Sequence, residues 1–222
     1  MPFGKLWWGM AACAAPILGV AQTLGAQMPG SPVLQNAWAN PGLTAAFNFS
    51  HLSGASSYAG AVAWSPGSAR FQLSGGVGAQ TRSNSSTSAA YGVRLNVPVI
   101  GATSSLGVSL FAGYGAISGG TIDSSVTKAL IPIGATVGFR KAIGETHGLS
   151  IYASPVYEAV NRGGGASNVG IFRGDVGLDV GITSAIGLTL GVEFGGSQPQ
   201  GSGKPSGTAF GGAISYAIGS HR

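Results

Sequence analysis

Charged residues that could act together recur on one side of several short alternating segments. Glu158, Asp175 and Glu193 each follow or precede an apolar residue and share their side of the segment with small residues such as Gly177 and Gly191. Carboxylates and guanidinium groups confined to one face can form ion pairs, share a proton or tune the ion preference of a lumen. The candidate set, predicted as one charge network, is Arg94, Arg140, Glu158, Arg173, Asp175, Asp179 and Glu193.

The elements that position these residues have a period of two. From Phe172 to Ile182, apolar residues or glycine occupy one side, and Arg173, Asp175 and Asp179 occupy the other. Side chains of a β-strand point alternately to opposite faces, so this pattern predicts a strand with two unlike faces. Segments 91–97, 131–140 and 188–194 repeat it.

About ten strands follow from this reading, and eight or twelve are also compatible with it. The connections expected at one end of the barrel are shorter than those expected at the other end. This difference is typical of an up-and-down membrane barrel. Aromatic residues lie near many of the expected strand ends, where membrane barrels carry aromatic girdles. The predicted strands are 43–51, 58–64, 71–80, 89–97, 105–117, 130–141, 149–160, 171–182, 187–195 and 208–218.

Composition decides which face meets which solvent. Only 8% of the 222 residues are charged, whereas soluble domains contain about 25% because their surface must be hydrated. If the polar face lines a lumen, the scarce charges are enclosed and the apolar face meets hydrocarbon. The sequence therefore predicts an all-β, transmembrane, antiparallel up-and-down β-barrel.

The N-terminal region predicts export. Residues 1–26 contain Lys5, an apolar run from Leu6 to Val20 and small residues near Ala26, which is the pattern of a signal peptide. Residues 27–42 are expected to form a periplasmic leader, and residues 43–222 the barrel. Cys13 lies within the signal; an alternative interpretation makes it a lipidated N-terminus after a loose lipoprotein processing box.

The signal, the alternating strands and the final segment from Phe210 to Ile218 together resemble the small single-chain outer-membrane β-barrels of bacteria with two membranes. This resemblance implies location in the outer membrane, contact with membrane lipid and lipopolysaccharide, and insertion by the barrel-assembly machinery. In such barrels that machinery reads an aromatic-containing last strand, and Tyr216 with Ile218 resembles that element. The segment Gly219–Arg222 follows it, in place of a terminal phenylalanine.

The expected function is a structural role or a narrow passive pore with a charged lumen. The alternatives are a secreted soluble β-sandwich or adhesin and, as a third class, an outer-membrane lipid-modifying enzyme. His51 lies beside Ser50 and Ser53, but no carboxylate close in sequence would orient it for catalysis. The protein is therefore expected not to be an enzyme.

No cofactor or nucleic-acid partner is expected. The sequence has no metal-ligand spacing or nucleotide-binding fingerprint. Its formal net charge is +5, and its basic residues do not form runs.

Within the lumen, counting across the expected loops sets Glu158 against Arg173 and Asp175 against Glu193. Asp175 and Glu193 would repel each other unless they share Arg173 or one of them holds a proton.

Overall fold

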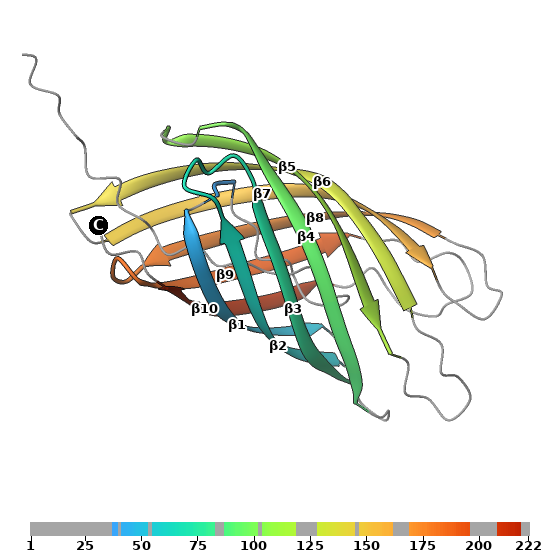
Figure 1. Cartoon of the computed structure of the whole chain (residues 1–222). Helices are drawn as coiled ribbons and strands as arrows, with labels where there is room; N and C mark the ends of the chain where they lie inside the picture. Colours follow the sequence, from blue (N-terminus) through green and yellow to red (C-terminus); the bar gives the residue numbers. More distant parts are fainter. Residues whose placement is uncertain are drawn as a thin grey trace, which may run out of the picture.

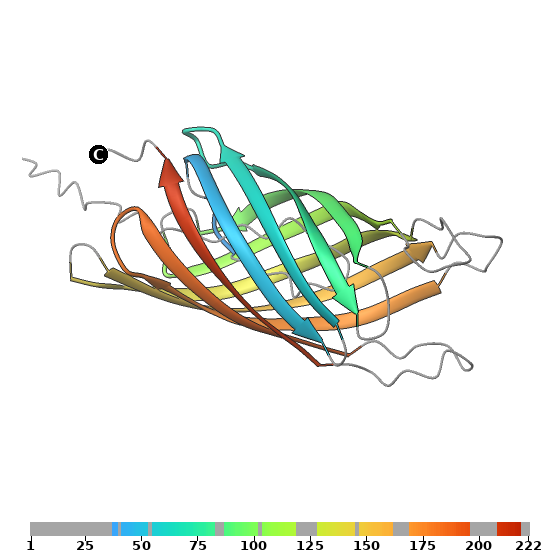
Figure 2. The ribbon, with the colours of Figure 1, turned by 90° about the horizontal axis from the view of Figure 1, so that it is seen from below.

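The described part of the chain forms one closed sheet. The computed structural model describes residues 37–39, 41–52, 55–82, 87–101, 104–118, 128–144, 147–161, 169–195 and 208–218. Each strand pairs antiparallel with its neighbours in sequence, and β1 pairs with β10 to close the barrel (Figures 1 and 2). The strands are β1 (Gly42–Leu52), β2 (Ala55–Ser65), β3 (Gln72–Arg82), β4 (Ser88–Ile100), β5 (Leu106–Ile117), β6 (Lys128–Ile143), β7 (His147–Asn161), β8 (Val169–Gly181), β9 (Ile186–Gly195) and β10 (Ala209–Ile218).

The predicted fold class is confirmed, including the count of ten strands. Sequence reasoning placed most strand ends within a few residues but shortened β2, which was expected at 58–64 and spans Ala55–Ser65. The extra residues are Ala55, Ser56, Ser57 and Ser65, which carry no apolar alternation. These residues belong to the strand because they pair with β1 across the hairpin. The residue pattern of one segment does not show such pairing with a neighbour.

The two faces of the sheet are inverted relative to a soluble protein. In β4, Tyr91, Val93 and Leu95 are exposed on the outer surface, while Arg94 and Asn96 between them are buried inside. Phe172 on β8 is 75% exposed. Such a continuous apolar surface suits hydrocarbon rather than water. The alternation fixes which side chains enter the lumen, because neighbours along a strand must face opposite ways.

The two ends of the barrel differ in their connections. The short-turn end carries the connections 66–71, 101–105, 144–146 and 182–185. The opposite end, which we call the long-loop end, carries the connections 53–54, 83–87, 118–127, 162–168 and 196–208. β1 begins and β10 ends at the short-turn end (Figure 2). Gly144, with φ of 67°, lies in a left-handed conformation within one of these connections, which favours glycine.

Aromatic side chains form two belts on the outer surface. Trp64, Phe139 and Tyr216 are exposed near the short-turn end, and Tyr157 and Phe172 lie near the long-loop end with ring centroids 5.0 Å apart. Girdles at both rims are typical of membrane barrels, because such rings favour the headgroup region. In the described ranges, no helix is long and apolar enough to cross a membrane.

Candidate functional site

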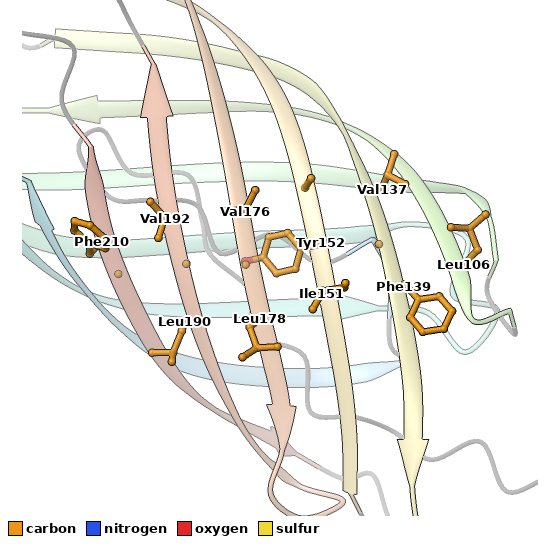
Figure 3. A pocket seen from close by; sticks show the side chains of 15 residues that line it. Leu106, Val137, Phe139, Ile151, Tyr152, Val176, Leu178, Leu190, Val192 and Phe210 are labelled. Atoms are coloured by element: carbon orange, nitrogen blue, oxygen red, sulfur yellow. The ribbon is translucent and has the colours of Figure 1, made fainter.

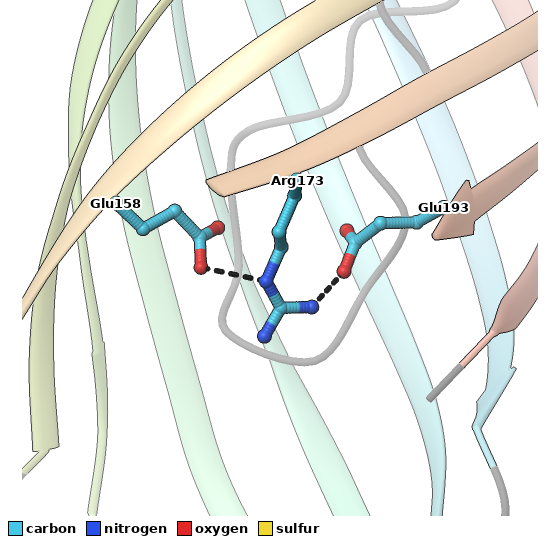
Figure 4. Close-up of polar contacts among 3 residues, drawn as sticks. All are labelled: Glu158, Arg173 and Glu193. Carbon is cyan, nitrogen blue, oxygen red and sulfur yellow. Dashed lines mark hydrogen bonds and ion pairs between the residues drawn. The ribbon is translucent and has the colours of Figure 1, made fainter. Parts of the chain in front are cut away.

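The lumen carries an ion triad built from three adjacent strands. Arg173 of β8 lies between Glu158 of β7 and Glu193 of β9 (Figure 4). Its Nε is 2.9 Å from Oε2 of Glu158, and its Nη1 donates a hydrogen bond to Oε1 of Glu193. Both glutamates are 5% exposed. One guanidinium group therefore compensates two buried carboxylates, which is the arrangement that tolerates burial of such charges.

Asp175 lies next to this triad without joining it. It faces Glu193 directly in the strand register, as the count across the β8–β9 turn predicts. Arg173 pairs with Glu193 and, as predicted, with Glu158, but it does not pair with Asp175, so the alternative in which Asp175 and Glu193 share Arg173 is wrong. Asp175 is 3% exposed, and neither of its carboxylate oxygens has a hydrogen-bond partner among the described residues.

Asp179 accepts hydrogen bonds from two hydroxyl groups on the neighbouring strands. Ser150 of β7 donates to its Oδ2 at 2.9 Å, and Thr189 of β9 donates to its Oδ1 at 2.5 Å. The side chain is 1% exposed. A buried carboxylate costs free energy unless donors replace its water, and these two hydroxyls supply that replacement from both neighbouring strands.

Arg94 lies over an aromatic ring on the next strand. Its guanidinium carbon is 3.6 Å from the ring centroid of Phe111, and Nη2 donates to Oδ1 of Asn96 at 3.4 Å. The Phe111 ring covers Gly134 of β6 so closely that a Cβ on Gly134 would overlap it. The glycine therefore provides the space that the ring occupies, and the ring provides a face for the cation.

The seventh predicted charge, Arg140, lies at the short-turn end of the lumen. Its Nε donates to the carbonyl oxygen of Ser104 at 3.2 Å, and its guanidinium carbon is 4.9 Å from the ring centroid of Trp38. All seven predicted charged residues are on the lumen face. Ion pairs link Glu158, Arg173 and Glu193.

Three bulky residues of the lumen escaped sequence reasoning. They are Trp38, Phe111 and Tyr152, and all are buried inside the barrel. Each lies against glycine on the lumen face: Trp38 against Gly107 and Gly138, Phe111 against Gly134, and Tyr152 against Gly177. These rings could have been predicted from glycine residues at lumen positions of paired strands, because the missing side chain of glycine leaves room for a ring.

Three residues of the predicted leader lie inside the barrel. Residues 27–42 were expected to lie in the periplasm, and of these Ala37, Trp38 and Ala39 are buried, with Trp38 1% exposed. Residues 27–36 and 40 lie outside the described residues. The polar and turn-forming residues around Trp38 predicted a solvated segment. The indole of Trp38 instead packs against the backbone of Gly107 and Gly138. The predicted signal segment 1–26 lies outside the described residues.

The opposite wall of the lumen is made of small side chains. On β1, β2 and β10 the described lumen residues carry no charge, and almost all of them are alanine, serine, threonine or glycine. They are Thr44, Ala46, Asn48, Ser50, Ser57, Ala59, Ala61, Ala63, Ser65, Ala209, Gly211, Ala213, Ser215 and Ala217. The large residues described above all project from β4–β9 or from the segment before β1, so this wall leaves space for them.

The histidine considered for catalysis faces outward. His51 is exposed, and its Nδ1 lies 2.9 Å from Oγ of Ser56, whereas Ser50 is buried in the lumen. Strand alternation separates these neighbours, and Ser53 lies outside the described residues. Within the described ranges, no three histidine, cysteine or acidic side chains gather closely enough to hold a metal ion.

A groove lies on the outer surface of the barrel. It crosses β5 to β10 and is lined by apolar side chains that include Val137, Phe139, Ile151, Leu178 and Leu190 (Figure 3). No charged side chain lines it. The groove therefore belongs to the apolar outer face and offers contact area for hydrocarbon, without groups for chemistry.

No family model and no curated protein matches the sequence. Among solved structures, a bacterial polysaccharide outer membrane secretin covers 74% of this chain at 9% identity with a TM-score of 0.50, and the chain spans 57% of the secretin's length. The NanC porin covers 79% of this chain and 100% of its own at 12% identity, TM-score 0.42. The N-terminal β-barrel domain of Pseudomonas aeruginosa OprF covers 79% and 96% at 7% identity, TM-score 0.38. This chain has the fold of an outer-membrane β-barrel.

Proposed function

We propose that this protein is an exported outer-membrane barrel with a closed lumen and a structural role in the cell envelope. The observation that carries the proposal is the burial of the lumen charges: Glu158, Asp175, Asp179 and Glu193 are each at most 5% exposed. Charges that line an aqueous pore keep their hydration and stay accessible to water. Here hydroxyls, an aromatic ring and opposite charges take the place of water for most of the buried charges.

The size of the barrel supports the same conclusion. A barrel of about eight strands is just filled by side chains, whereas about 16 to 18 strands leave an aqueous channel. With ten strands, this barrel is near the filled limit, and its large residues face a wall of small ones. Its partners in this role are membrane lipid, lipopolysaccharide and the barrel-assembly machinery, and the segment 1–26 is removed on export.

Single-channel recording tests the proposal. Purified residues 27–222, refolded in detergent and shown to be folded by a heat-dependent shift in gel mobility, are added to a planar bilayer. We expect no discrete conductance steps, because no hydrated path passes the buried charges. Long-lived steps from folded protein at low voltage would overturn the closed barrel.

A second candidate function is a narrow conduit for small cations, and Asp175 is the observation that favours it. This buried carboxylate has no hydrogen-bond partner among the described residues and faces the carboxylate of Glu193. Small cations passing this level would meet negative charge, so the conduit would prefer cations. Cation-selective reversal potentials that are lost in Asp175→Asn would establish this function in place of the structural one.

A further inference from the structure

The segment before β1 places one aromatic ring in a shaped site at the short-turn end of the lumen. Trp38 lies on the lumen faces of β5 and β6, against Gly107 and Gly138, and beneath Arg140. We propose that these three residues form a socket for a flat aromatic ring, that Trp38 occupies it as an internal ligand, and that this docking seals the short-turn end. The sealing part of this inference rests on the closed lumen proposed above.

Steric fit defines the floor of the socket. Gly107 and Gly138 are directly paired across β5 and β6, so their backbones form one flat patch. A Cβ on Gly107 would lie 2.6 Å from Cε2 of Trp38, and a Cβ on Gly138 would lie 2.9 Å from Cζ3. Side-chain carbons do not approach so closely, so any larger residue at either position requires the indole to move.

Electrostatics defines the rim of the socket. The guanidinium group of Arg140 is 4.9 Å from the indole centroid, within the range of a cation–π contact. Its Nε donates to the carbonyl oxygen of Ser104, in the connection between β4 and β5, which restrains the guanidinium group at the rim. A flat, uncharged, electron-rich ring of indole size fits both the glycine floor and the cation.

The position of Trp38 explains the seal. The next lumen pair along β5 and β6 is Ser109 and Thr136, and both are 0% exposed. Residues 37–39 belong to none of the ten strands, so Trp38 can leave without breaking the strand ladder. Release of the indole would therefore open a path from the short-turn end to Ser109 and leave the barrel intact.

Cysteine accessibility tests the seal. The predicted mature chain 27–222 contains no cysteine, so Ser109→Cys gives a single reactive site just inside the socket. We expect slow modification by a charged, water-soluble thiol reagent, and modification at least several-fold faster when Trp38→Ala is added. Millimolar indole should restore the slow rate. The control is Trp64→Ala, which removes the outward-facing tryptophan of β2 and should leave the rate unchanged.

Fluorescence tests the docking without relying on the seal. In Trp64→Phe, Trp38 is the only tryptophan of the predicted mature chain, and its emission should be shielded from iodide. Gly138→Leu should raise iodide quenching several-fold while the heat-dependent gel shift of the barrel persists. Quenching of Trp38 that is already complete without Gly138→Leu overturns the socket.

The outcomes separate the two proposals. Equal labelling of Ser109→Cys with and without Trp38 overturns the seal, whichever the rate. Conductance steps from the protein with Trp38 intact overturn the closed barrel, but they leave the iodide result as evidence for or against the socket. Indole that fails to slow labelling in Trp38→Ala overturns the assignment of the socket to aromatic rings.

Discussion

The two walls of the lumen are built on opposite rules. From β4 to β9 the wall supplies large or charged residues such as Arg94, Phe111, Tyr152 and Arg173, while β10, β1 and β2 supply mainly alanine, serine and glycine. Facing large residues with small ones lets a core fill its space without overlap. The difference teaches that, in the closed barrel proposed above, large side chains of one wall fill the space that the small side chains of the other wall leave.

The wall with large residues also carries the charges, and this has an energetic reason. Ion pairs and hydroxyl contacts such as Arg173 with Glu158, and Asp179 with Thr189, link adjacent strands. Each carboxylate needs a partner within a few ångströms once water is excluded. Neighbouring strands supply such partners at short range, whereas the other wall carries no charged side chain among its described lumen residues.

The largest expected effect comes from removing the cation of the triad. Arg173→Ala should lower the free energy of unfolding by about 3–5 kcal/mol, because Glu158 and Glu193 stay buried without their partner. Urea unfolding in detergent micelles, followed by tryptophan fluorescence, measures the change. The control, Arg70→Ala in an exposed turn, should stay within about 0.5 kcal/mol. Equal stability of the two variants would mean that water hydrates the triad and that the lumen is open.

The next effect comes from removing one donor to Asp179. Thr189→Val keeps the shape of the side chain but deletes the hydroxyl that donates to Oδ1. A hydrogen bond to a buried charge contributes about 1.5–3 kcal/mol, so unfolding should become easier by that amount. Thr208→Val at an exposed position serves as the matched control in the same urea titration. A loss no greater than that of the control would show that water replaces the hydroxyl.

The smallest effect probes the opposite wall. Ala61→Phe adds a ring to the small wall of β2, where Ala61 is buried in the lumen. Overfilling a packed interior costs about 1–3 kcal/mol. Val62→Phe places the same ring on the outer surface of the same strand and should change stability by less than about 0.5 kcal/mol. Equal stability of the two variants would mean that the lumen wall formed by β1, β2 and β10 borders free space and does not pack against the wall formed by β4 to β9.

Much of the fold was accessible from sequence because its signals are local. The alternation around Asp175 and Asp179 placed β8, and counting across a short turn aligned Asp175 with Glu193. Trp38 escaped prediction because its place depends on Gly107 and Gly138, which are far away in sequence and adjacent only through strand pairing. The ion pair of Arg173 with Glu158 was predicted, but the exclusion of Asp175 from the triad was not, since it depends on three strands at once.

The sequence by itself determined which face of each strand is apolar and that the seven candidate charges lie on the other face. This follows because side-chain direction alternates along a strand whatever its neighbours are. Only the tertiary structure decided which enclosed groups meet: Arg173 with two glutamates, Arg94 with Phe111, and Trp38 with paired glycines. These contacts depend on the register between paired strands, which the pattern of a single strand does not contain.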